Sequence, residues 1–262
     1  MKKEKKQVVY YYEDELNDEF SGVDVKPKKV DDKYRYIRRN PFFYILRFIL
    51  YRLIAIPVSY IFLRIKFGLK IKNKKALKEA KKTGAYIYAN HTQMMADPFI
   101  PTMVTYPRGI YVVVNSANMS LKGLGWALPY LGALPLPDNM SGMKNFLGAL
   151  EWHSKKNHNI MIYPEAHIWP YYTGIRPFKS TSFKYPIKYG KPVYCFTNVY
   201  VKRGRKGNKV GMTTYVDGPF YPNTELAGRE QEQELRDRVY AKMLERSKLN
   251  EIEVIKYERK KN

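Results

Sequence analysis

Five short runs rich in β-branched and aromatic residues constrain the fold of this 262-residue chain more than any other feature. Their composition and length are typical of β-strands, and segments with helical periodicity separate them. The runs cover residues 85–90, 109–115, 159–164, 192–200 and 210–216. Strands that alternate with helices predict an α/β fold with a mixed central sheet flanked by helices.

Two helical segments have the clearest periodicity. One covers residues 141–156, and the other is a charged helix near the end of the chain. This second helix places Leu235, Val239 and Met243 at successive i, i+4 positions. One apolar face on each helix predicts that both pack against the sheet.

Residues 42–67 are the most apolar stretch of the chain. Their length suits a membrane-spanning helix, which needs about 20 apolar residues. Arg47, Arg52 and Arg64 argue against a span, because each charge costs about 3 kcal/mol at mid-bilayer. Pro57 is expected to kink or split the helix. The pattern predicts a pair of amphipathic helices lying in the membrane interface; the alternative is a helix buried against the domain core.

The charge balance also points to an anionic partner. Lys and Arg total 47 against 24 Asp and Glu, a formal net charge of +23. Eight lysines lie between Lys66 and Lys82, opposed only by Glu79. Basic residues beside an apolar anchor favour an anionic membrane surface; a solvated lysine-rich helix face is the alternative. A nucleic-acid partner is not predicted, because no nucleic-acid-binding motif is present and the 24 tyrosines are scattered.

The chain divides into three predicted parts. Residues 1–40 form a charged, mostly extended N-terminal arm with a short helix around residues 13–20. Residues 41–75 contain the membrane-associated amphipathic helices, and residues 76–262 form the α/β domain. The start of the chain lacks the apolar region of a secretion signal, and the single Cys195 suits a reducing compartment. We therefore expect the domain at the cytoplasmic face of the cell membrane.

The first candidate site follows the first strand. His91 comes directly after the run 85–90, and Asp97 follows with five residues between them. One interpretation is structural: Asp97 caps a helix that starts at Pro98, and His91 lies in a turn. The other is catalytic: His91 acts as a general base and Asp97 orients its ring. The residues alone leave both open.

A second candidate cluster follows another apolar strand. Glu165 comes directly after the run 159–164, and Arg176 and Lys179 follow. Two strands that end in ionisable residues are expected to reach the same crevice at the carboxyl edge of the sheet. Lys122 lies in a third, glycine-containing stretch.

Together these stretches resemble the glycerolipid acyltransferase family that includes 1-acylglycerol-3-phosphate acyltransferases. The segments that carry the resemblance are "NHTQMMAD", "KGLGWALPYLGALPLPDN" and "YPEAHIW" with "RPFKS", within residues 84–200. The resemblance implies an acyltransferase domain, a membrane-associated N-terminal helix pair, and His91 and Asp97 as catalytic residues. It also implies that Glu165 binds the acceptor.

Three departures from the family pattern leave the acceptor open. Five residues, not the family's four, separate the histidine from the aspartate. The family's Pro-Glu-Gly-Thr-Arg is Pro-Glu-Ala-His-Ile here, and Pro137 stands where a second arginine is usual. Lys122, Arg176 and Lys179, with Arg108, are therefore predicted substitutes for phosphate contact; the alternative for each is a solvated surface charge.

The resemblance implies acyl transfer to a lysophospholipid hydroxyl, most simply that of 1-acylglycerol-3-phosphate. The donor is acyl-CoA or acyl-carrier protein, and no cofactor or metal is expected. His153, His158 and His167 lack the spacing of a zinc site. The alternatives are a non-catalytic lipid-binding relative and an acyltransferase with a phosphate-free acceptor.

Overall fold

The computed structural model describes residues 7–22, 28–205 and 207–260. Within them, a central sheet has the strand order β2-β8-β7-β3-β6-β4-β5, and β1 pairs with β9 in a small parallel sheet. β8 is antiparallel to β7 and β2 runs with β8, whereas the other five strands are parallel. The predicted mixed α/β sheet is thus confirmed. The strands are β1 (Val8–Tyr12), β2 (Lys70–Lys72), β3 (Tyr86–Ala89), β4 (Ile110–Val114), β5 (Ala133–Pro135), β6 (Asn159–Ile162), β7 (Val193–Arg203), β8 (Lys209–Phe220) and β9 (Ile255–Arg259).

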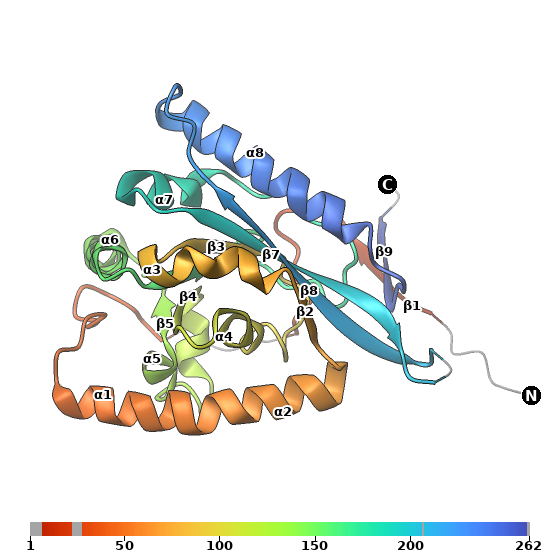
Figure 1. Ribbon diagram of the computed structural model, residues 1–262, viewed down its shortest axis with the longest axis horizontal. Helices are drawn as coiled ribbons and strands as arrows, with labels where there is room; N and C mark the ends of the chain where they lie inside the picture. Colours follow the sequence, from red (N-terminus) through yellow and green to blue (C-terminus); the bar gives the residue numbers. More distant parts are fainter. Residues whose placement is uncertain (1–6, 23–27, 206, 261–262) are drawn as a thin grey trace, which may run out of the picture.

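Helices cover both faces of this sheet. Figure 1 shows α7 and α8 on one side, and α4, α5 and the helix α1–α2 on the other. The helical elements are α1 (Pro41–Arg47), η1 (Phe48–Ala55), α2 (Ile56–Phe67), η2 (Lys74–Lys78), α3 (Ala80–Thr83), α4 (Ile100–Thr105), η3 (Ser116–Ser120), α5 (Leu128–Leu131), α6 (Met140–Lys155), η4 (Thr181–Phe183), α7 (Lys184–Tyr189) and α8 (Gly228–Ser247).

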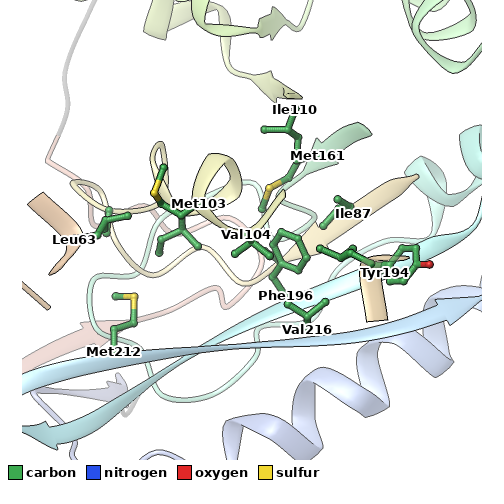
Figure 2. Close-up of a cluster of buried hydrophobic side chains, with 14 of the residues drawn as sticks. Leu63, Ile87, Met103, Val104, Ile110, Met161, Tyr194, Phe196, Met212 and Val216 are labelled. Carbon is green, nitrogen blue, oxygen red and sulfur yellow. The ribbon is translucent and has the colours of Figure 1, made fainter. Parts of the chain in front are cut away.

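Each face of the sheet has its own apolar core. Ile87 of β3 faces the core formed with α2 and α4, which Figure 2 shows with Leu63 and Met103. Its neighbour Tyr88 faces the other core, formed with α6 and α8. Successive side chains of a strand point to opposite faces, so one buried strand supplies both cores. Leu235, Val239 and Met243 are fully buried on α8, as predicted.

The N-terminal apolar segment is one continuous helix, Pro41–Phe67, and not the predicted pair. Its middle third, η1, has π-helical turns, and Ile56 donates its N–H to Tyr51 O, five residues back. Pro57 has no N–H, and in an α-helix its ring would clash with the carbonyl four residues earlier. The wider π turns just before Pro57 accommodate the proline, so the helix continues.

This helix packs lengthwise on the domain, and its inner side carries polar groups as well as the core residues Leu63 and Phe67. Tyr51 and Ser59 are buried, and the guanidinium group of Arg47 donates to the carbonyls of Pro129 and Tyr130. The outer side carries apolar side chains that are 40–77% exposed: Phe42, Tyr44, Ile45, Phe48, Ile49, Leu53, Ile54, Val58, Tyr60, Ile61 and Ile65. The helix is long and apolar enough to cross a membrane. It is therefore a candidate membrane-associated element.

The described part of the N-terminal arm is anchored to the domain. β1 pairs with β9 at the other end of the chain, and residues 15–17 form a turn where a short helix was predicted. The carboxylate of Asp14 accepts the N–H of Leu16, and that of Asp18 accepts the N–H of Glu13. Aspartates favour such side-chain turns over a helix interior.

Candidate active site

The two predicted clusters meet at the carboxyl edge of the sheet. β3 and β6 are parallel neighbours, and His91 and Glu165 follow them. The carboxylate of Glu165 accepts the backbone N–H of His91 at 3.1 Å. The two strands therefore end at the same edge of the sheet, with His91 and Glu165 in contact.

His91 and Asp97 are paired. Nδ1 of His91 lies 2.8 Å from Oδ2 of Asp97. The same carboxylate oxygen accepts the backbone N–H of Gln93 at 2.8 Å. The chain between them turns tightly, and helix α4 begins only at Ile100, with Phe99 at the N-cap position. Asp97 is therefore not the cap of a helix at Pro98, and the additional loop residue does not separate the pair.

The surroundings of the pair set its chemistry. The side chain of Asp97 is 0% exposed and that of His91 is 17% exposed. Because a carboxylate only accepts, Nδ1 carries the proton and Nε2 has a free lone pair. An imidazole with this tautomer and a buried carboxylate behind it can accept a proton at Nε2.

Tyr163 supports both members of the pair, and the sequence analysis did not identify it. Its ring stacks on the imidazole of His91, with centroids 4.2 Å apart and planes 20° apart. Its hydroxyl donates to the backbone carbonyl of Asp97 at 2.7 Å. Tyr163 is the next-to-last residue of the predicted run 159–164, two positions before Glu165, so its position was the available signal.

Glu165 and Arg176 form an enclosed cluster behind His91. Arg176 Nε lies 3.7 Å from the Glu165 carboxylate, and both side chains are 0% exposed. The carboxylate also accepts the backbone N–H of Arg176 at 3.3 Å. Burial raises the pKa of Glu165 to about 7, although Arg176 and the hydrogen bonds act against this. Glu165 thus holds the backbone at His91, and Arg176 holds Glu165.

The guanidinium group of Arg176 is occupied by the protein itself. It donates to the backbone carbonyls of Glu15, Glu165 and His167, and it stacks over the ring of Trp169 at 5.0 Å. Acceptor contact by Glu165 or Arg176 requires that this cluster opens, and their substrate binding stays a prediction.

The two predicted lysines are exposed and lie apart. Lys122 is in the loop before α5, which packs against α1. Lys179 follows Phe178, whose ring packs against Tyr240 of α8 on the other face. The structure does not bring the lysines together, and substrate contact by either stays a prediction. Arg108 binds the carbonyl of Asn157, just before β6, at the opposite edge of the sheet from His91.

The N-terminal arm covers the loop that follows Glu165, which sequence reasoning also missed. The carboxylate of Glu19 lies 3.1 Å from Nδ1 of His167, and Trp169 donates its indole N–H to Asp18 O. Phe20 packs edge-on against Trp169. In the part of the chain that the structure describes, no three His, Cys, Asp or Glu side chains are grouped as metal ligands.

Comparison with known proteins agrees with this geometry. The Acyltransferase family model matches residues 68–199, which is half of the chain. The chain belongs to the acyltransferase family. This confirms the resemblance inferred from the motifs, and it supports an acyltransferase.

The fold is that of a solved acyltransferase. PlsC, the 1-acyl-sn-glycerophosphate (LPA) acyltransferase from Thermotoga maritima, is similar with a TM-score of 0.55 at 15% sequence identity. The match covers 82% of this acyltransferase chain and 86% of PlsC. No curated protein matches the sequence.

Proposed function

We propose that this acyltransferase moves a fatty acyl group from an acyl thioester to the hydroxyl group of a lysophospholipid. We propose 1-acylglycerol-3-phosphate as the acceptor, so that the reaction is a step of phospholipid synthesis. The observation that carries this proposal is the 2.8 Å contact between His91 and Asp97 at the carboxyl edge of the sheet. Similarity to the Thermotoga acyltransferase supports the choice of acceptor.

The pair supplies general-base catalysis. Nε2 of His91 takes the proton of the acceptor hydroxyl while its oxygen attacks the thioester carbonyl carbon. Asp97 stabilises the imidazolium ion that forms. As the C–S bond breaks, the leaving thiolate takes the proton back from His91. The products are an ester and a free thiol, which is that of CoA or acyl-carrier protein.

We place this reaction at a membrane surface. The outer side of the helix Pro41–Phe67 is apolar and exposed, whereas its inner side carries Tyr51 and Ser59 together with the core residues Leu63 and Phe67. On a soluble domain, the outward side of such a helix carries polar residues instead. The ring of Phe62 on this helix packs against Phe99, two residues after Asp97, with centroids 5.7 Å apart. These contacts support a helix that lies in the interface beside the site, and we propose that this is the cytoplasmic face.

The experiment is an acceptor panel with the full-length chain in vesicles of anionic phospholipid. Wild type is given acyl-CoA or acyl-carrier protein, with 1-acylglycerol-3-phosphate or a lysolipid without phosphate, and His91→Ala is the blank. We expect transfer to 1-acylglycerol-3-phosphate by wild type only. Vesicle binding without transfer to any acceptor would contradict the proposal and would indicate a non-catalytic lipid-binding relative.

One observation favours a second candidate, which is the same reaction on a phosphate-free acceptor. Arg176 is enclosed by three backbone carbonyls and is not available to a phosphate group. In addition, the family's arginine is Ile168 here. Faster transfer to the phosphate-free lysolipid in the same panel would select this candidate.

A further inference from the structure

The loop of residues 121–127, which precedes α5, presents two large apolar side chains to solvent. Leu124 is 46% exposed and Trp126 is 61% exposed. Exposed Lys122 lies on the same loop. The proposed reaction at His91 does not involve any of these three side chains.

The loop is folded tightly, so this exposure is built into its shape. The N–H of Gly125 donates to Leu121 O at 2.8 Å, and a Cβ at Gly125 would lie 2.2 Å from Met119 O. The indole N–H of Trp126 donates to Gly123 O at 3.0 Å. Because this polar atom already has a partner within the loop, the exposed surface of the ring is apolar.

Aromatic contacts join the loop to the first turns of the apolar helix. Trp126 lies 6.3 Å from Tyr130 of α5, and Tyr130 stacks on Phe43 of α1 at 4.7 Å. The neighbouring Phe42 is 77% exposed. Figure 1 shows α5 directly against this end of the helix.

We propose that the loop is a second membrane contact, in which Leu124 and Trp126 enter the lipid interface. This inference rests on the proposed membrane association of the helix. The occupant is a bilayer, because the apolar surface continues from the helix and Lys122 complements anionic headgroups. Tryptophan is also the residue that membrane–water interfaces favour.

A second contact has a geometric consequence. A helix alone leaves the domain free to rotate about the helix axis, whereas a loop beside it fixes that rotation. The domain is then held in one orientation on the surface, with the side that carries α5 and the helix α1–α2 toward the lipid.

The experiment uses the full-length chain with vesicles of phosphatidylglycerol and phosphatidylcholine, with and without lipids brominated on their acyl chains. Trp126 is one of three tryptophans, and Trp169 is fully buried. We expect a blue shift and bromine quenching in wild type. Trp126→Phe is expected to lose most of the quenching while it still binds.

A double variant tests the contribution to binding. Leu124→Ser with Trp126→Ser is expected to lower the vesicle partition coefficient by about tenfold. Leu249→Ser is the matched control, because Leu249 is 42% exposed and follows α8 on the far side of the domain. Circular dichroism checks that both variants fold.

Two results would overturn this inference alone: wild type bound to vesicles without quenching that depends on Trp126, or a double variant that partitions like wild type. If wild type does not bind vesicles at all, the membrane part of the proposed function fails as well.

Discussion

Two side-chain pairs that contain histidine lie at opposite edges of the central sheet. One pairs histidine with aspartate, and the other pairs two histidines. At the carboxyl edge, His91 contacts the buried carboxylate of Asp97 at 2.8 Å. At the amino edge, just before β6, Nδ1 of His153 lies 2.9 Å from Nδ1 of His158. The imidazole of His91 contacts a carboxylate, whereas the imidazole of His153 contacts another imidazole.

Burial and nearby positive charges keep the pair at the amino edge neutral. Burial, followed by the repulsion of His158 and Arg47, lowers the pKa of His153 to about 3. Burial, Arg47 and Arg108 lower that of His158 to about 4. These two imidazoles stay neutral and act as packing groups. A charged imidazole at position 91 instead has a carboxylate to stabilise it.

Removing the charge of Asp97 should make the first pair resemble the second. Asp97→Asn keeps the shape of the side chain but cannot stabilise an imidazolium ion. We expect kcat to fall by about 10²–10⁴-fold, measured as acyl transfer in vesicles. Unchanged turnover in a folded variant would show that His91 acts without Asp97.

Replacing the enclosed Arg176 tests how much its cluster contributes to the stability of the domain. Arg176→Met leaves the carbonyls of Glu15 and His167 without a donor and the carboxylate of Glu165 without a charged partner in the core. We expect a loss of about 3–5 kcal/mol in the free energy of unfolding, measured by denaturant titration.

Arg108→Met is the matched control at the amino edge. Arg108 is exposed and makes a single hydrogen bond, to Asn157 O. We expect a loss below about 1 kcal/mol. Equal losses in the two variants would contradict a special role for Arg176.

The histidine pair at the amino edge should appear in the pH dependence of stability. Its folded pKa values lie below the usual 6.5, so between about pH 4 and 6.5 the unfolded chain binds more protons. The free energy of unfolding therefore falls as pH falls, by up to about 1.4 kcal/mol per pH unit for each group.

His158→Gln should remove about half of this slope. Glu165 acts in the opposite direction, because its raised pKa makes stability fall as pH rises from about 4.5 to 7. Its contribution is the same in wild type and variant, so it cancels in their difference. Identical slopes would mean that His158 is already charged in the folded protein.

Tyr163 gives the smallest expected effect. Tyr163→Phe keeps the ring stacked on His91 but removes the hydrogen bond to Asp97 O. We expect a loss of about 1 kcal/mol in stability and a fall in kcat of less than about tenfold. A loss as large as that of Asp97→Asn would assign the hydroxyl group a direct catalytic role.

Local sequence patterns were sufficient for five of the seven strands of the central sheet and for the edge at which His91 and Glu165 lie. The five predicted strands are present, because runs of β-branched and aromatic residues specify strands locally. The order of His91 and Glu165 after neighbouring strands was enough to place them at one edge.

The rest depends on contacts between distant residues. Arg176 turns inward because the carbonyl of Glu15, 161 positions away, accepts its hydrogen bond. β1 pairs with β9 across almost the whole chain. Pro57 predicted a break, but the π turns before it depend on the backbone, which a residue pattern does not show.

The most direct test compares the two histidine pairs in one assay. His91→Gln and His158→Gln each replace an imidazole with an amide, and acyl transfer is measured for both in the same vesicles with circular dichroism as the check on folding. The account predicts a loss of at least about 10²-fold for His91→Gln and a rate within about threefold of wild type for His158→Gln. Wild-type turnover in folded His91→Gln would contradict it.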